Sequence, residues 1–232
     1  HRQRRPATLS FPRPGIAPPP RPAYIVAMTM QLNFNGPSDR RLFFFDTETT
    51  GLPRDWNAPL NARTLGNWPR MVQLAWILCD DAGNELASAC RIIRPQGYVI
   101  PPEAARVHGI TTERALAEGI ALAEAPAECL PHVDQASSAA ARTLASDEKL
   151  LAAEFLRLGR TTPFLKKPMH CTMKESTQFC ALPGFYGFKY PNLTELHRKL
   201  FQKAFEGAHD AYADVRACKA AYYELRTRGV MG

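Results

Sequence analysis

The stretch Phe43-Phe44-Phe45-Asp46-Thr47-Glu48-Thr49-Thr50-Gly51-Leu52 decides the fold of this chain. Its apolar start predicts a buried strand, and its Thr-Thr-Gly end predicts a turn. Because alternate side chains of a strand share a face, Asp46 and Glu48 should project together from its end. Two such carboxylates repel each other unless a cation or hydrogen-bond donors compensate them. A strand end that merely meets a polar turn would look the same, so partners elsewhere in the chain must decide.

The composition is that of a soluble globular protein. The chain has 232 residues, enough for one sizeable domain or two small ones, with 45% hydrophobic and 22% charged residues. No stretch approaches the roughly 18 apolar residues that a membrane span needs. Six cysteines occur without a C-x-x-C pair, which argues against a zinc ribbon and gives no sign of a secreted disulfide framework. We therefore expect reduced thiols and a cytoplasmic protein.

The net charge of +7 is concentrated at the N-terminus. The first 27 residues contain five arginines and no acid, which leaves only +2 for the rest of the chain. Charge alone therefore does not mark the body of the protein as a polyanion binder. Residues 1–40 are rich in Pro and Arg, and we expect a disordered or polyproline-like extension. It is interpreted as a translated upstream extension or a linker, and a nucleic-acid-binding arm is the less favoured reading.

Three strands are predicted at the start of the folded part, over Leu42–Asp46, Met71–Cys79 and Glu85–Arg94. The segment Asp80-Asp81-Ala82-Gly83-Asn84 is typical of a hairpin connection, so the three strands should be consecutive and antiparallel. The connection over residues 53–69 is long, and loops of that length are often functional.

Helical patterns follow, and residues 136–145 are weak for any element. Ser146 is the expected N-cap of an amphipathic helix that Gly159 ends. Residues 164–171 are expected to contain a short strand. The remaining helices are expected over residues 102–107, from Thr111 or Thr112 through 116, over 121–130, over 172–180, along Leu193, Leu196 and Leu200, and over 209–226.

The last predicted helix carries an acidic and imidazole-bearing start. It begins Gly207-Ala208-His209-Asp210-Ala211-Tyr212-Ala213-Asp214. Asp210 is explained as a helix cap, since acids in a first turn complement the helix dipole. Capping does not explain Asp214, which lies among small alanines that would let it approach a sheet.

Taken together, these motifs resemble those of the DEDDh 3′–5′ exonucleases, the proofreading-type family with a ribonuclease H-like fold. The resemblance covers about residues 41–230, which we take as one exonuclease domain. Its motifs are Asp-x-Glu at 46 and 48, an acid at 147, and His-x-x-x-x-Asp at 209 and 214. The segments Gln73-Leu74-Ala75 and Val107-His108-Gly109-Ile110-Thr111 are also similar to the family's.

The middle motif departs from the family pattern. Where the family usually shows Ala-His-Asn-x-x-Phe-Asp, this chain has Ala141-Arg142-Thr143-Leu144-Ala145-Ser146-Asp147. The acid is kept, while Arg, Thr and Ser replace His, Asn and Phe. The departure bears on rate and substrate range more than on metal binding, which needs Asp147.

The resemblance implies a mixed five-stranded sheet flanked by helices, with the first three strands antiparallel, and a site for two Mg²⁺ ions, for which Mn²⁺ can substitute. Paired hard cations held by carboxylates suit phosphodiester hydrolysis. By resemblance, Asp46, Glu48 and Asp214 would hold the first ion and Asp46 the second, with Asp147 acting mostly through water. His209 would take the proton from the attacking water, a task that suits an imidazole side chain.

Substrate contacts are expected from Thr49, Gly51, Leu52 and His108. Four aromatic residues over 185–190 are interpreted either as a base-stacking surface or as packing under a loop. Four lysines at 166, 167, 174 and 189 are read either as phosphate contacts or, by default, as a solvated face.

The implied activity is release of nucleoside 5′-monophosphates from single-stranded 3′ ends, with DNA favoured, in DNA repair or replication. Two alternatives stay open. One is an RNA-trimming exoribonuclease with the same site. The other is a catalytically weakened homologue that binds nucleic acid or a DNA polymerase, although the chain ends soon after its last helix and we expect no polymerase-docking tail.

Overall fold

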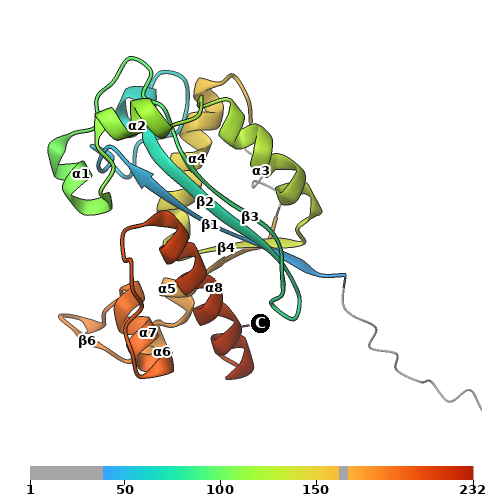
Figure 1. Cartoon of the computed structure of the whole chain (residues 1–232). Helices are drawn as coiled ribbons and strands as arrows, with labels where there is room; N and C mark the ends of the chain where they lie inside the picture. The colour runs from blue at the N-terminus through green and yellow to red at the C-terminus, as the bar shows by residue number, and fades with distance from the viewer. Residues whose placement is uncertain (1–38, 162–166, 232) are drawn as a thin grey trace, which may run out of the picture. The chain divides into compact units, whose positions relative to one another are not determined.

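The computed structural model describes residues 39–161 and 167–231. Over these residues the chain forms a five-stranded sheet with helices against both faces (Figure 1). The predicted Pro/Arg-rich extension over residues 1–40 lies outside the described residues, apart from residues 39 and 40, and stays a prediction. So do the boundaries of the predicted exonuclease domain.

The sheet has the strand order β3-β2-β1-β4-β5. β1 pairs antiparallel with β2, which pairs antiparallel with β3, while β4 and β5 run parallel to β1. This confirms the predicted fold class, a mixed five-stranded sheet whose first three strands are antiparallel. The strands are β1 Arg41–Thr49, β2 Met71–Asp80, β3 Glu85–Ile92, β4 Ser138–Ala141 and β5 Met169–Cys171.

The helices match most of the predicted positions. The predicted helix over residues 172–180 is interrupted at Ser176 and forms two short helices. A 3₁₀ turn, Leu65–Asn67, lies in the long β1–β2 connection. The α-helices of the described residues are α1 Pro102–His108, α2 Thr112–Glu118, α3 Glu124–Gln135, α4 Leu144–Arg157, α5 Thr172–Glu175, α6 Thr177–Cys180, α7 Leu193–Phe201 and α8 Ala211–Thr227.

Two expectations about the segment before α4 are wrong. Residues 138–141, thought weak for any element, form the fully buried strand β4. Ser146 is not the N-cap of α4, because the helix begins at Leu144 and the Ser146 hydroxyl donates to the Thr143 carbonyl oxygen inside the first turn. Alanine has a low β-propensity, but its small side chain lets helices pack closely on both faces of a central strand.

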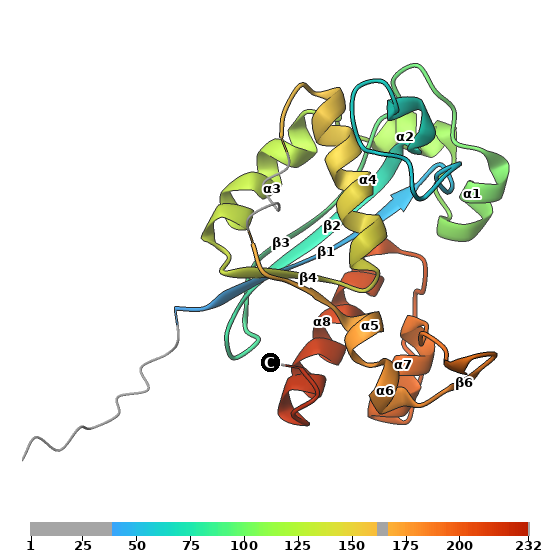
Figure 2. The same cartoon turned by 180° about the vertical axis from the view of Figure 1, so that it is seen from behind.

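Each face of the sheet is covered by helices that bury a different set of strand residues. Phe43 and Phe45 of β1 pack with Leu151 and Phe155 of α4 and with residues of α3. On the opposite face, Leu42 and Phe44 pack with α7 and α8. Figure 2 shows α3 and α4 in front of the sheet, whereas Figure 1 shows α8 in front of it. The strand that carries Asp46 and Glu48 is therefore held rigidly between two layers.

The aromatic segment after α6 forms an exposed hairpin. Its strands are β6 Pro183–Gly184 and β7 Gly187–Phe188, and the side chains of Phe185 and Tyr186 at its tip are 91% and 96% exposed. The alternative that these rings pack under a loop is therefore wrong. No helix of the described residues has the length and apolarity of a membrane span.

Candidate active site

The site lies where β1 ends, and its first two acids come from that strand. Asp46 pairs with Ala75 and Glu48 with Gln73 across the antiparallel β1–β2 ladder. Both carboxylates are half-buried, and they share the face that packs against α8. As predicted from their i, i+2 spacing, the two acids lie side by side on one face of the strand end.

The start of α8 is fixed against β2 by one buried glutamine. Gln73 accepts a hydrogen bond from the Ala211 backbone N–H at 3.1 Å and donates to the Asp210 carboxylate at 3.4 Å. Asp210 is the N-cap of α8, as predicted, and accepts from the backbone N–H groups of Tyr212 and Ala213. Gln73 therefore aligns the first turn of α8, which contains Asp214, with the end of β1. The sequence analysis named the segment that contains Gln73, but it did not predict that Gln73 positions α8.

Glu48, His209 and Asp214 come together at this point. One possible ligand atom of each lies within 4.8 Å of the others, and His209 is exposed while the two acids are half-buried. The backbone N–H of His209 donates to Asp214 Oδ2 at 3.4 Å. His209 has a φ of +70°, a conformation that costs a non-glycine residue about 1–2 kcal/mol. Such local strain is typical of functional positions.

Asp147 reaches the same region from the other layer. It lies in the first turn of α4, is buried, and its Oδ1 accepts a hydrogen bond from the Thr47 hydroxyl at 3.3 Å. Thr47 stands between Asp46 and Glu48 on β1, so Asp147 is fixed to the same strand end. Four acids from three distant segments thus converge, although the predicted roles of these residues stay predictions.

The electrostatics of the cluster are unfavourable without a cation. Burial and then repulsion by Asp147, Asp214 and Glu48 raise the pKa of Asp46 well above its ordinary value. Burial followed by the charge of Asp214 raises the pKa of Glu48 to about 8. Burial also raises the pKa of Asp147 to about 7 and that of Asp214 above its ordinary value. The folded site therefore holds protons, or cations in their place, more tightly than isolated carboxyl groups would.

Arg142 is a further member of the site that the sequence marked only as a departure. It directly follows β4, and continuing the β1–β4 register by two residues places it beside Asp46. Its positive charge lowers the pKa values of Asp46, Asp147 and Asp214, but in each case burial outweighs it. Within the described residues its buried Nε atom has no hydrogen-bond partner. One guanidinium does not neutralise four acids.

The donor set fits divalent cations. Carboxylate oxygens are the ligands that Mg²⁺ and Mn²⁺ prefer. Within the described residues, the buried Oδ1 of Asp214 has no hydrogen-bond partner, which is consistent with an oxygen that coordinates a cation. Asp46, Glu48, Asp147 and Asp214 are the residues that would hold such ions.

The predicted substrate-contacting residues lie around this strand end. Thr49 is the last residue of β1 and donates its hydroxyl proton to the Gly51 carbonyl oxygen at 2.7 Å. Leu52 is 78% exposed, so its side chain is open to contact with a ligand. His108, at the end of α1, is buried and lies against the Thr49 backbone, and burial lowers its pKa. Thr49 directly follows Glu48 in β1, and His108 contacts Thr49, so these two positions lie next to the acidic cluster.

The metal-free protein is expected to lose stability as pH rises. The clustered carboxyl groups have raised pKa values, so they bind more protons in the folded than in the unfolded state, and their contribution to stability falls between about pH 4.5 and pH 8. Thermal unfolding in EDTA should therefore give a lower Tm at pH 8 than at pH 5.5, and Mg²⁺ should raise the Tm at pH 8. Glu48→Gln should reduce the pH effect. A Tm that is indifferent to both pH and Mg²⁺ would contradict the clustering of acids.

The described residues share their fold, a mixed sheet with this strand order and helices on both faces, with solved structures of other proteins. Solved structures of exonuclease I have this fold. The Escherichia coli enzyme in complex with a dA16 oligonucleotide has a TM-score of 0.64 and 20% sequence identity, over 82% of this chain and 41% of that chain. Exonuclease I from Methylocaldum szegediense gives 0.62 and 22%, over 82% and 41%.

The zinc-bound form of the E. coli exonuclease I–ssDNA complex is similar to the same degree, with a TM-score of 0.65 and 20% identity over 82% of this chain and 41% of that chain. This chain thus spans about 41% of the length of the exonuclease I chains it resembles. The sequence matches no protein-family model and no curated protein.

Proposed function

We propose that this protein is a metal-dependent 3′–5′ exonuclease of the DEDDh type. The observation that carries the proposal is the cluster at the end of β1, where four acids with raised pKa values lie beside an exposed imidazole. A structural role does not explain this arrangement, because mutual repulsion of buried carboxylates destabilises the fold. Perturbed acids gathered beside a base are typical of active sites.

The chemistry is divided among the members of the cluster. Bound at the four carboxylates, two divalent ions would supply positive charge to the oxygens of the phosphodiester. His209 is exposed and lies next to Glu48 and Asp214, which supports a role for its imidazole as the acceptor of a proton from an attacking water. The Asp214 carboxylate accepts the His209 backbone N–H, which fixes the strained backbone at this position.

The proposed substrate is the 3′ end of single-stranded DNA, and the products are nucleoside 5′-monophosphates. The exposed Leu52 and the backbone of Thr49 and Gly51 are proposed to contact the terminal nucleotide, with His108 beside them. Support comes from the fold, which is shared with exonuclease I structures that contain a DNA oligonucleotide. RNA stays the alternative substrate, because no described group here distinguishes the two sugars.

The test is digestion of a single-stranded oligonucleotide labelled at its 5′ end, with Mg²⁺, beside the same sequence as RNA. Stepwise shortening of the labelled strand, with release of mononucleotides and none in EDTA, is the expected result. Shortening of RNA alone would support the exoribonuclease. No shortening of either strand, together with retained binding, would overturn the enzyme in favour of a nucleic-acid-binding homologue.

That weakened homologue is a second candidate because of Arg142. Among the described residues named above, Arg142 is the only cation that acts on the pKa of Asp46. It stands where the DEDDh exonucleases usually have a histidine. A fixed positive charge there competes with a divalent ion for the same carboxylates. If the protein is such a weakened homologue, its affinity for divalent ions should be low, and Arg142→Ala should raise that affinity.

Replacement of His209 should separate catalysis from folding. His209→Ala is expected to lower the cleavage rate by about 10²–10⁴-fold, because it removes the proton acceptor. The exposed side chain makes no described hydrogen bond of its own, so the Tm should change little. Rates and Tm should be measured together, with His132→Ala on α3 as the histidine control. Equal rates for His209→Ala and the wild-type protein would remove the imidazole from the mechanism.

The proposed setting is the cytoplasm, where the six cysteines, all unpaired in this structure, would stay reduced. Removal of nucleotides from single-stranded 3′ ends is a step of DNA repair and replication, and we propose these as the processes served. Association with a DNA polymerase remains a prediction from the resemblance.

A further inference from the structure

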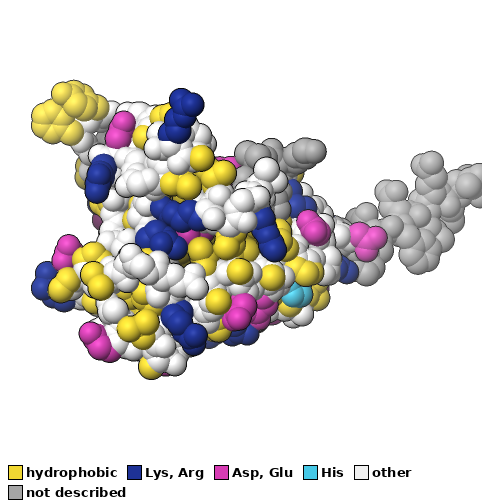
Figure 3. Space-filling view, turned by 90° about the horizontal axis from the view of Figure 1, so that it is seen from above, with side chains coloured by type: hydrophobic (Ala, Val, Ile, Leu, Met, Phe, Trp, Pro, Cys, Tyr) yellow, Lys and Arg dark blue, Asp and Glu magenta, His cyan; other side chains and the backbone are white. Residues whose placement is uncertain are grey.

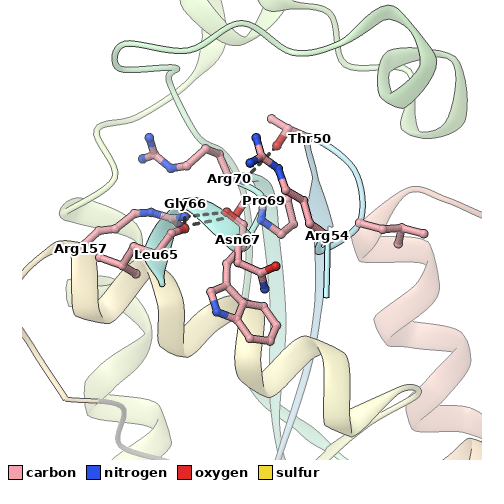
Figure 4. Close-up of a pocket in the computed structure, with 10 residues that line it drawn as sticks. Thr50, Arg54, Leu65, Gly66, Asn67, Pro69, Arg70 and Arg157 are labelled. Atoms are coloured by element: carbon pink, nitrogen blue, oxygen red, sulfur yellow. Dashed lines mark hydrogen bonds between the residues drawn. The ribbon is translucent and has the colours of Figure 1, made fainter. Parts of the chain in front are cut away.

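A polar cavity of about 510 Å³ opens beside the predicted nucleotide contacts, and it carries three arginines. It is formed by the turn after β1, by the long β1–β2 connection and by the end of α4. In the view of Figure 4 the Arg54 side chain extends toward Thr50, whereas the Arg70 side chain extends to the other side, away from Thr50. The lining residues are Thr50, Leu52, Arg54, Leu65, Gly66, Asn67, Trp68, Pro69, Arg70 and Arg157.

One buried acid organises the floor of this cavity. Glu154 of α4 is fully buried and accepts from Arg70 Nε at 3.0 Å and from the Met71 backbone N–H at 2.8 Å. It also pairs with Arg157 Nη1 at 2.9 Å. Arg70 lies over the Tyr98 ring, 4.4 Å from its centroid. Arg70 is thereby held in one orientation, with 24% of its side chain still exposed.

The three arginines are not all committed to the fold. Arg157 donates to the carbonyl oxygens of Leu65, Trp68 and Pro69, so it serves the loop (Figure 4). Arg54 is exposed, and within residues 39–161 and 167–231 its guanidinium has no hydrogen-bond or ion-pair partner. The cavity is lined by three arginines and no acid, and the carboxylate of Glu154 pairs with only two of them, which leaves an excess of two positive charges.

The cavity is joined to the acidic cluster through the end of β1. The Thr50 backbone N–H donates to the Arg70 carbonyl oxygen and the Arg70 N–H donates to the Thr50 hydroxyl, both at 2.9 Å. Thr50 is two residues from Glu48, a span of at most about 7 Å of extended chain. Figure 3 shows basic side chains near the centre of the face seen from above. A single-stranded nucleic acid whose 3′ end reaches four carboxylates needs positive charge close by, because its phosphates are repelled by those acids.

We propose that this cavity binds a backbone phosphate of the single strand next to the phosphodiester that is cleaved, through Arg54 and Arg70. The inference rests on the proposed function and deepens it, because it assigns a binding role to the long β1–β2 connection. Arg70 supplies a guanidinium held in place by Glu154 and Tyr98, and Arg54 supplies an exposed one. Recognition of a phosphate in this way is independent of base sequence.

The test compares Arg54→Ala with Arg63→Ala, a matched control that removes an exposed arginine from the same connection but not from the cavity. Binding of fluorescein-labelled dT12 is measured by anisotropy in EDTA at several salt concentrations. Loss of one phosphate contact should reduce the slope of log K against log salt by about 0.7 and weaken binding roughly threefold or more at low salt. Arg63→Ala should change neither slope nor affinity.

A second arm separates this proposal from the proposed function. Hydrolysis of the p-nitrophenyl ester of thymidine 5′-monophosphate, which has no neighbouring phosphate, is measured with Mg²⁺. Arg54→Ala should keep the wild-type rate on this ester while its kcat/KM on dT12 falls. Absence of strand binding by the wild-type protein, or equal slopes for the two variants, would overturn the phosphate site. An inert wild-type protein that still shows the slope difference would overturn the nuclease alone.

Discussion

Asp46→Asn is expected to lower hydrolysis of single-stranded DNA by about 10³-fold or more, the scale on which one electrostatic group of an active site counts. Asp46 lies at the centre of the cluster, since Asp147, Asp214 and Glu48 all act on its pKa. Asparagine has the same shape but loses the negative charge that would hold a cation. The change should be measured as kcat/KM on an end-labelled oligonucleotide with saturating Mg²⁺.

The same variant should fold at least as well as the wild-type protein. Removal of one of four mutually repelling carboxylates relieves the metal-free fold, so its Tm in EDTA should not fall. Asp134→Asn, an exposed acid on α3, is the matched control and should leave the rate unchanged. Wild-type activity in Asp46→Asn would refute the role of this strand end. A Tm well below that of the wild-type protein would show instead that Asp46 stabilises the folded state.

The largest effect on stability is expected from Glu154→Ala, at about 3–5 kcal/mol of unfolding free energy. The carboxylate is fully buried and satisfies Arg70, Arg157 and the Met71 backbone N–H at once. Without it, two guanidiniums face each other with no acid between them, and a buried donor loses its acceptor. Urea unfolding of the wild-type protein and the variant measures the difference.

Glu118→Ala is the control for this change. Glu118 also pairs with an arginine, Arg114, but that pair is exposed and joins residues i and i+4 of α2. Exposed pairs contribute about 0.2–1 kcal/mol, so its loss should be several times smaller. Similar losses for the two variants would mean that the Glu154 network contributes no more than a surface ion pair.

The strands β1 and β2 were predictable because their own residues are apolar, and β3 was predictable because a tight turn over residues 81–84 connects it to β2. β4 was not, because Ser138–Ala141 has no local signal for a strand. Its place is decided by the neighbours that bury it, namely β1 on one side and β5 on the other. Local propensity is weak evidence where tertiary packing determines the element.

The candidate site was predictable to a similar extent. The spacing of Asp46 and Glu48 gave a shared face, whereas the convergence of Asp147, His209 and Asp214 was inferred from a resemblance of motifs. The cavity with Arg54 and Arg70 was not foreseen. Glu154, which organises it, appears in the sequence as an ordinary acid of an amphipathic helix, and its partners Arg70 and Met71 lie more than 80 positions away.

The most direct test of this account is a titration with Mn²⁺, followed by electron paramagnetic resonance of the free ion. Carboxylates from β1, α4 and α8 should together bind two Mn²⁺ ions per chain in the wild-type protein. Asp214→Asn combined with Glu48→Gln should abolish that binding while the protein stays folded. Absence of bound Mn²⁺ in the wild-type protein, or unchanged binding in the double variant, would contradict the assembly of these distant acids into one cation site.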